Sequence, residues 1–144
     1  MNKFLVHTDG GSRGNPGPAA IGVVIEGGLV GKKNYGEYIG IATNNEAEYK
    51  AIIFALKKLK QLIGQERAKE SEIEFIVDSE LLVKQMNNEY KVKEEGIQKL
   101  FLEVHNLKLD FGKVIFTHVL RSKNIQPDKL LNQVLDREDN KLKL

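Results

Sequence analysis

Hydrophobic and polar positions change their period along this chain, from the alternation typical of strands to the spacing typical of helices. The first third is rich in strand formers and is broken by glycines, which predicts a meander of three strands. These strands are expected at residues 3–8, 20–25 and 29–41, with a glycine-rich turn over residues 9–18 and a tight hairpin in which Gly27 and Gly28 adopt positive φ.

Helical spacing begins near residue 45. Apolar side chains then recur on one face as far as residue 63, which predicts a long helix. The polar stretch 64–72 predicts a surface loop. The later elements are expected as a strand over 73–77, a short helix from its cap Ser79 to Met86, a helix over 93–109, a strand over 114–119, and a last helix with Pro127 in its first turn that ends at Leu135. The charged tail 137–144 is expected to fray.

This order of elements predicts an α/β fold. Strands joined by short turns pair antiparallel, whereas strands joined through a helix favour parallel, right-handed crossovers. We therefore expect a mixed five-stranded sheet, with three antiparallel strands, two parallel strands and helices on both faces. A chain of 144 residues with 41% hydrophobic content is expected to form a single domain over residues 1–144.

Composition narrows the chemistry that the chain can perform. The absence of cysteine excludes disulfides, thiolate zinc sites and cysteine nucleophiles, and it suits a cytoplasmic protein. The first apolar run is too short for a signal peptide, and no run approaches the roughly 18 apolar residues of a spanning helix, so no membrane partner is expected. With 22 basic and 20 acidic residues, the net charge of +2 does not by itself indicate nucleic-acid binding.

Four acids, Asp9, Glu48, Asp78 and Asp128, stand where a strand is predicted to end or a helix to begin. Such ends meet at one edge of an α/β sheet, so these side chains can converge. Each acid alone also has a structural explanation, as a turn former, a helix-start charge, a cap or an acid favoured by a helix dipole. Together they predict a metal site, because clustered carboxylates repel one another without a cation and because hard oxygen ligands favour Mg²⁺ or Mn²⁺.

The segments around these acids resemble the four sequence blocks of type 1 ribonuclease H. The blocks are Asp9-Gly-Gly-Ser-Arg-Gly-Asn-Pro-Gly-Pro, Thr43-Asn-Asn-Glu-Ala-Glu48, Asp78-Ser-Glu and Asn124-Ile-Gln-Pro-Asp128, in the family's order over residues 3–136. The resemblance implies a ribonuclease H-like fold and hydrolysis of the RNA strand of an RNA/DNA hybrid by two divalent cations, leaving 5′-phosphate and 3′-hydroxyl ends. By position, Asp9 would bridge both ions, Asp128 would complete one site, and Glu48 and Asp78 would hold the other.

The resemblance also implies contacts with the nucleic acid. The substrate-binding set is Gly10, Gly11, Asn15, Thr43, Asn44, Asn45 and Glu80. The asparagines would reach the minor groove, where short amides can read 2′-hydroxyls, and Thr43 would lie in a pocket for a DNA phosphate. Glu46 and Glu80 are candidates to accept 2′-hydroxyl hydrogen bonds, or are solvated acids at helix starts. Gly10 and Gly11 would allow close backbone approach, or would simply form a tight turn.

Two departures from the family pattern affect how a hybrid would be gripped. Many relatives carry a basic, tryptophan-containing handle between the middle helices, whereas residues 87–96 here are short and mix lysines with glutamates. This arrangement resembles the handle-less archaeal and bacterial subgroup, and it predicts weaker or differently placed binding. Glu94 and Glu95 stand where relatives often place an asparagine of the phosphate pocket, which leaves the role of Thr43 open.

A third departure lies in the loop before Asp128, which lacks the glycine- and histidine-rich flap of better-studied relatives. His118 lies at a comparable distance but falls at the end of a predicted strand, where a structural role is expected. Arg121 is therefore the candidate to contact phosphate or assist turnover, and is counted with the catalytic residues. The alternative is that Arg121 is a solvated loop arginine without a functional role.

Two other functions are compatible with these residues. The first is a non-catalytic module that binds RNA/DNA hybrids or double-stranded RNA, which the altered flap and missing handle would suit. The complete acid set opposes it, because a pure binder gains nothing from acids beside phosphates. The second is a resolvase- or integrase-like nuclease of the same superfamily, which the asparagine cluster opposes.

We expect a monomer with an RNA/DNA hybrid as partner, and double-stranded RNA as a second partner to test.

Overall fold

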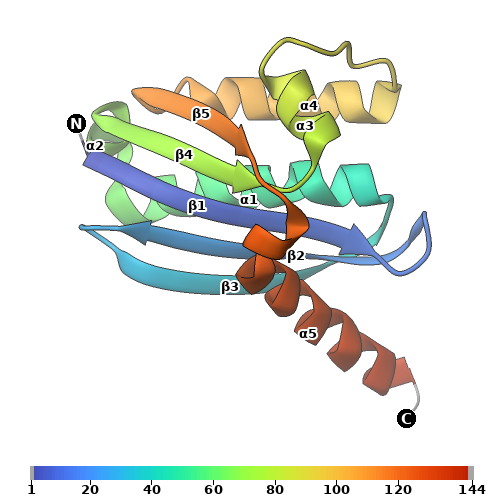
Figure 1. The fold of residues 1–144 in the computed structure, drawn as a ribbon. Coiled ribbons are helices and arrows are strands. Elements are labelled where there is room, and N and C mark those ends of the chain that lie inside the picture. The colour runs from blue at the N-terminus through green and yellow to red at the C-terminus, as the bar shows by residue number, and fades with distance from the viewer. Residues whose placement is uncertain (1, 143–144) are drawn as a thin grey trace.

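The computed structural model describes residues 2–142 (Figure 1). Its elements in chain order are β1 (Asn2–Ser12), β2 (Gly17–Gly27), β3 (Gly31–Ala42), α1 (Asn44–Ile63), α2 (Gln65–Lys69), β4 (Ser71–Val77), α3 (Glu80–Met86), α4 (Glu95–Lys108), β5 (Lys113–His118), the 3-10 helix η1 (Arg121–Lys123) and α5 (Ile125–Leu142). Within the described range, none of the helices combines the length and the apolar character needed to cross a membrane.

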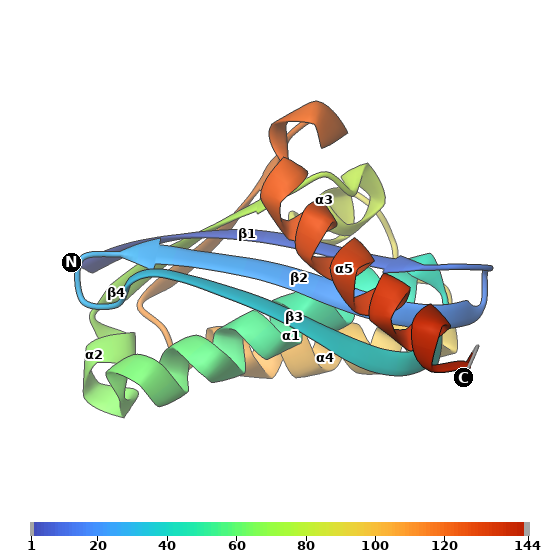
Figure 2. The ribbon, with the colours of Figure 1, turned by 90° about the horizontal axis from the view of Figure 1, so that it is seen from below.

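The five strands form one mixed sheet in the order β3-β2-β1-β4-β5. β2 pairs antiparallel with β1 and β3, whereas β4 pairs parallel with β1 and β5. Figure 2 shows α5 on one side of the sheet and α1 with α4 on the other. The predicted fold class is therefore confirmed, with β1 at the centre of the sheet.

Alternation along the strands separates a buried face from a face that carries polar groups. Phe4 and Val6 of β1 and Phe75 of β4 are buried beneath the apolar side of α1, which includes the fully buried Leu56 and Leu59. Odd-numbered positions of β1 face the opposite side of the sheet, where α5 lies. Asp9 is one of these positions, so the strand's alternation directs it away from the main core and toward α5.

The first strand is longer than its alternation predicts, which corrects the expected turn over residues 9–18. The ladder with β2 continues through Ser12, so Asp9, Gly10 and Gly11 lie inside β1 and do not form a tight turn. The connection between β2 and β3 also differs from the prediction. Gly31 there has a positive φ of 68°, whereas Gly27 and Gly28, which were predicted to have positive φ, do not.

Two segments expected to be irregular are ordered instead. Residues 64–72 form the short helix α2 and the start of β4, because Ala68 is fully buried and the Ser71 hydroxyl donates to the Arg67 carbonyl. The final helix does not stop at Leu135 but continues to Leu142, which corrects the predicted fraying of residues 137–142. Residues 143–144 of that predicted tail lie outside the described residues.

Candidate metal and nucleic-acid site

The four predicted acids come together beside the second half of β1. Asp9 lies within β1, Glu48 near the start of α1, and Asp78 directly after β4. One carboxylate oxygen from each of these three lies within 4.8 Å of the other two. Asp128, in the first turn of α5, lies close enough to Asp9 for its charge to raise the pKa of that carboxyl group. Sequence positions far apart therefore converge on one cluster.

Two glycines let the helices that carry Glu48 and Asp128 approach the central strands closely. A Cβ on Gly10 would overlap the backbone of α1 at Ala47, and a Cβ on Gly22 would overlap the carbonyl oxygen of Pro127 in α5. Gly22 is also the β2 partner of Asp9. The close approach predicted for Gly10 is thus made to α1, which presses the start of that helix against the strand that carries Asp9.

Electrostatics in the cluster favour protonated acids when no cation is present. Burial, followed by the charges of Asp78, Asp128 and Glu48, raises the pKa of Asp9 to about 8. Burial also raises the pKa of Glu48 to about 7, although a hydrogen bond with Ser79 opposes this rise. The pKa of Asp78 is raised by burial as well, against the charge of Arg121. Carboxylates that resist ionisation at neutral pH are those that a bound cation would stabilise.

The donor set fits a hard divalent cation. Carboxyl groups as close together as those of Asp9, Glu48 and Asp78 repel one another when ionised, and a bound cation would remove that repulsion. Asp78 Oδ2 is buried and has no hydrogen-bond partner within residues 2–142. A buried carboxylate oxygen without a partner is costly unless something binds it. All the ligands are oxygens, as Mg²⁺ and Mn²⁺ prefer.

The acids open onto a cavity of about 320 Å³ that also receives basic and amide side chains. Arg121 of η1 lines this cavity with Asp9, Glu48 and Asp128, so the loop arginine singled out in the sequence does reach the acids. His118 ends β5 and is exposed, as predicted for a strand-end residue. The functional role of Arg121 remains a prediction.

The predicted asparagines connect the β1–β2 hairpin to the start of α1. Asn44 Oδ1 accepts hydrogen bonds from the Ser12 amide (3.0 Å) and the Ser12 hydroxyl (3.2 Å). The backbone N–H of Asn44 in turn donates to Asn15 Oδ1 at 2.9 Å. Thr43 and Glu46 form a reciprocal capping box at the start of α1. Both asparagines therefore hold the edge of the cavity in shape, and Glu46 is occupied by the cap.

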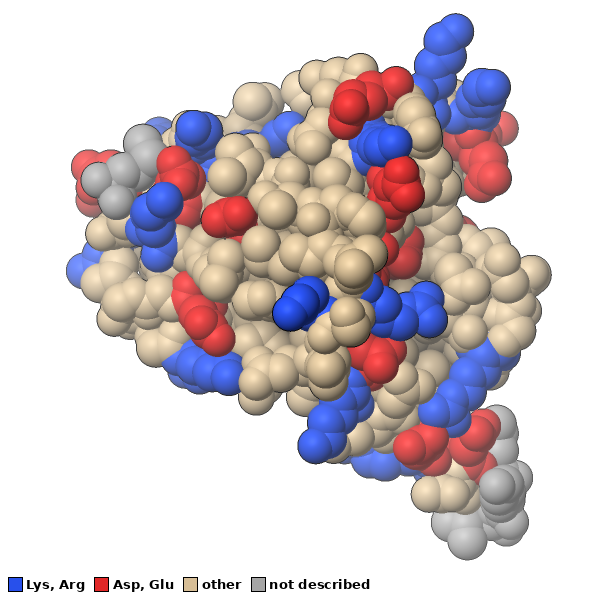
Figure 3. Space-filling model, in the orientation of Figure 1, with Lys and Arg blue, Asp and Glu red and all other residues tan. Residues whose placement is uncertain are grey.

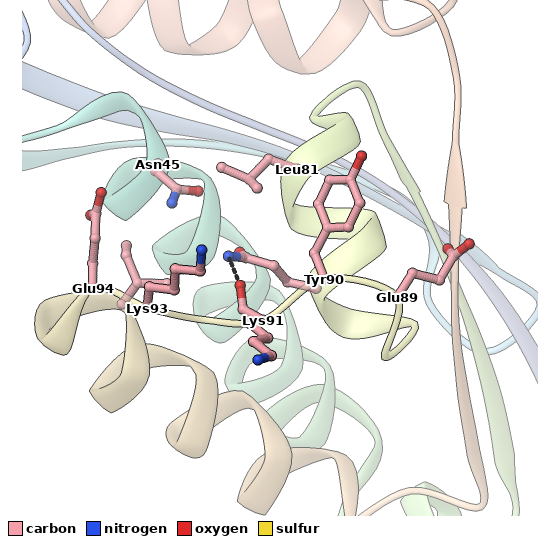
Figure 4. Close-up of a pocket in the computed structure, with 9 residues that line it drawn as sticks. Asn45, Leu81, Glu89, Tyr90, Lys91, Lys93 and Glu94 are labelled. Atoms are coloured by element: carbon pink, nitrogen blue, oxygen red, sulfur yellow. Dashed lines mark hydrogen bonds between the residues drawn. The ribbon is translucent and has the colours of Figure 1, made fainter.

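Asn45 and Glu80 lie away from the acid cavity. Asn45 lines a second cavity, of about 530 Å³, between the start of α1, α3 and the segment 87–94 (Figure 4). Its Oδ1 atom is buried and without a hydrogen-bond partner in the described part of the chain. Glu80 is exposed at the start of α3 and forms an ion pair with Lys84 at 2.9 Å. A 2′-hydroxyl contact by Glu80 stays a prediction.

Sequence reasoning missed several side chains that support the site. Asn124 is 1% exposed, and its Nδ2 donates to the Thr8 carbonyl at 2.8 Å, which ties the loop before Asp128 to β1 beside Asp9. Buried Gln85 accepts from the Tyr49 hydroxyl at 2.7 Å. A polar residue inside an otherwise apolar helix face is the signal that could have identified Gln85. Nothing in local spacing indicates that Asn124 reaches a strand over a hundred residues away in sequence.

The sequence profile of the reverse transcriptase-like family matches residues 7–134, a span that contains all four acids. The chain belongs to this family. Its relatives include the ribonuclease HI of Halobacterium salinarum, which is 37% identical over 131 residues covering 89% of this chain and 62% of that protein. A bifunctional protein of Mycobacterium tuberculosis is 35% identical over 138 residues, which cover 93% of this chain and 36% of that protein.

Solved structures place this reverse transcriptase-like chain with the type 1 ribonucleases H, as the sequence blocks implied. LC11-RNase H1, isolated from compost and solved in complex with an RNA/DNA hybrid, matches with a TM-score of 0.86 and 39% identity, over 94% of this chain and 98% of that one. Only residues 87–94 separate α3 from α4, which agrees with the handle-less subgroup. This chain spans about a third of the Mycobacterium protein and less than two thirds of the Halobacterium one.

Proposed function

We propose that this chain is an endoribonuclease that hydrolyses the RNA strand of RNA/DNA hybrids with two divalent cations, Mg²⁺ or Mn²⁺. The observation that carries the proposal is the convergence of Asp9, Glu48, Asp78 and Asp128 at the carboxyl ends of adjacent strands and the starts of two helices. Support comes from family membership and from a structural relative that was solved with such a hybrid.

Each acid has a role that follows from its position. Asp9 neighbours both Asp78 and Asp128, so it would hold both cations. Glu48 and Asp78 would complete one cation site, and Asp128 would complete the other. Bound there, two cations would neutralise charge on the phosphate and would stabilise the attacking and leaving oxygens. Arg121 lines the same cavity and would add a positive charge beside the phosphate.

The products follow from which bond is broken. A water oxygen attacks phosphorus, and the 3′ oxygen of the preceding nucleotide leaves with the electron pair and gains a proton. The cleaved strand then has a 3′-hydroxyl on one side and a 5′-phosphate on the other. The chain's own contribution is to hold the cations and the phosphate in line, which is the larger part of catalysis in phosphoryl transfer.

The start of α1 would lie across the minor groove of the hybrid. Consecutive residues Asn44 and Asn45 line different cavities, Asn44 the acid cavity and Asn45 the larger one. An RNA-containing duplex presents its 2′-hydroxyls in a wide, shallow minor groove that short amides can reach. The RNA strand would therefore enter the acid cavity, while the DNA strand would pass over the cavity that Asn45 lines.

The larger cavity offers a grip that does not need a basic handle. Figure 4 shows Tyr90 on one side of it, beside Leu81, and Lys93 on the other, below Asn45, while the side chain of Lys91 points away. Tyr90 is 50% exposed, as a side chain that stacks on a sugar or base must be. The connecting segment is held by the Gln85 amide, which donates to the Lys91 carbonyl at 3.3 Å. This segment would take the place of the missing extension.

Surface charge agrees with recognition by local geometry. On the face shown in Figure 3, lysines and arginines are dispersed among acids and do not form one continuous patch. With a net charge of +2, long-range attraction of a polyanion is weak. We therefore expect modest hybrid affinity that depends on the two cavities, and a chain that acts as a monomer.

The proposal is tested by cleavage of an end-labelled RNA strand paired with DNA, paired with RNA, or single-stranded, in Mg²⁺ or Mn²⁺. We expect cleavage of the hybrid and its loss in Asp9→Asn, with the circular dichroism spectrum unchanged. Retained cleavage in Asp9→Asn would refute the metal assignment. Hybrid binding without cleavage of any substrate by the wild type would instead establish a binding module.

A further inference from the structure

Arg13, at the tip of the β1–β2 hairpin, is held by the last turns of α5. Its Nη2 atom lies 2.6 Å from Asp136 Oδ1, and its Nη1 atom lies 3.0 Å from Asp139 Oδ2. Figure 2 shows the hairpin and the end of α5 side by side. These contacts involve the stretch that was expected to fray, and they give a reason for its helical continuation to Leu142.

The same guanidinium also reaches Asn132, one turn after Asp128. Arg13 Nη2 donates to Asn132 Oδ1 at 3.3 Å and to the Asn132 carbonyl at 3.4 Å. Asn132 Nδ2 donates to the Asp128 carbonyl at 3.0 Å and to Asp128 Oδ1 at 3.2 Å. A continuous path of hydrogen bonds therefore runs from two acids at the end of α5, through Arg13 and Asn132, to a carboxylate of the metal cluster.

The chemistry of the donors fixes the direction of this path. A guanidinium only donates hydrogen bonds, so the oxygen of the Asn132 amide must face Arg13 and its nitrogen must face Asp128. Asp128 Oδ1 then accepts a hydrogen bond from Asn132, which restrains the rotation of this carboxylate beside Asp9. A half-turn of the amide would place its oxygen against two acceptors of Asp128 and its NH₂ group against the guanidinium of Arg13, so the contacts at both ends hold this orientation. Arg13, which also lines the acid cavity, thus helps to set which atom of the Asn132 amide faces Asp128.

We propose that Arg13 and Asn132 are positioning residues that orient Asp128 toward the cations, and that Asp136 and Asp139 hold Arg13 in place. The proposal rests on the proposed function, because it assigns these residues to the same site. Side chains that orient metal ligands change metal affinity or activity by about 10-fold to 100-fold when they are removed. The two acids are 65% and 50% exposed at their side chains, so their replacement leaves the core intact.

The experiment compares Arg13→Gln, Asn132→Ala and the double variant Asp136→Asn/Asp139→Asn with the wild type. Arg137→Gln is the matched control, since Arg137 lies on the same helix and, among residues 2–142, donates only to the Gln133 carbonyl of its own helix. Two quantities are measured: kcat and KM on an RNA/DNA hybrid, and Mn²⁺ binding to the substrate-free protein by calorimetry. The second does not depend on activity.

We expect kcat to fall about 10-fold in each test variant with KM little changed, and Mn²⁺ binding to weaken in parallel. Arg13→Lys, which keeps the ion pairs with the acids, should recover part of kcat, and Arg137→Gln should behave as the wild type. Unchanged kcat and Mn²⁺ binding would overturn the proposal, as would a change confined to KM, which would make Arg13 a substrate contact. If the wild type does not cleave but Mn²⁺ binding still weakens in the variants, the positioning role stands and the proposed function fails.

Discussion

In the absence of divalent cations, the folded protein should become less stable as the pH rises. Burial raises the pKa of Glu48 from its ordinary value of 4.5 to about 7, and that of Asp9 to about 8. Such groups stabilise the folded state below their unfolded pKa, and this contribution is lost as the pH rises through the folded pKa. The loss is therefore expected between about pH 5 and about pH 9.

The size of this loss in unfolding free energy can be worked out from the pKa of Glu48 alone. The rise in this pKa from 4.5 to about 7, at about 1.4 kcal/mol per unit, corresponds to between about 3 and 4 kcal/mol of unfolding free energy, of which roughly 3 kcal/mol is lost in that interval. Asp9 acts in the same direction. Burial lowers the pKa of His7, which destabilises the folded state as the pH falls below about 6.5, and this effect is common to the wild type and to Glu48→Gln.

The assay is urea unfolding followed by circular dichroism, in a chelator, at about pH 5 and about pH 9. The wild type should lose roughly 3 kcal/mol more than Glu48→Gln, which keeps the shape of the side chain but cannot ionise. Mg²⁺ should restore stability to the wild type at the higher pH, because cation binding requires the ionised acids. Equal pH dependence of the two proteins, or a metal-free protein that becomes more stable toward pH 9, would refute this account of the cluster.

Two further outcomes follow from the packing around the site. Gly22→Ala should lower the free energy of unfolding by about 1–3 kcal/mol and remove most of the activity, because the new methyl group displaces Pro127 and the start of the helix that carries Asp128. Gly28→Ala is the control, since a Cβ at Gly28 meets nothing within 4 Å. Tyr90→Ala should weaken hybrid binding by the metal-free protein roughly fivefold, as measured by fluorescence anisotropy, through lost stacking. Tyr38→Ala, which also removes an exposed tyrosine, should have no effect, and equal weakening in both would contradict the assigned grip.

Local sequence carried enough information to find the acids but not the contacts that place them. Alternation and helical spacing located every strand and all the described helices except α2 and the 3-10 helix η1, since burial imposes a period on each element. The elements' ends were less well predicted, because the β1–β2 ladder holds Gly10 and Gly11 in extended backbone that glycine does not itself favour. The end of α5 was missed for a similar reason: its partner Arg13 lies over 100 residues earlier.

The sequence by itself determined the order of the elements, the mixed sheet and the acids that could form a metal site, because these depend on period and on residue type. Only the tertiary structure decided which groups face one another. It brought three of the acids to within 4.8 Å of one another, separated Asn44 from Asn45 into two cavities, and brought Arg13 to Asn132. Such contacts join residues that are distant in the chain, and their partners depend on how the helices pack on the sheet rather than on any local pattern.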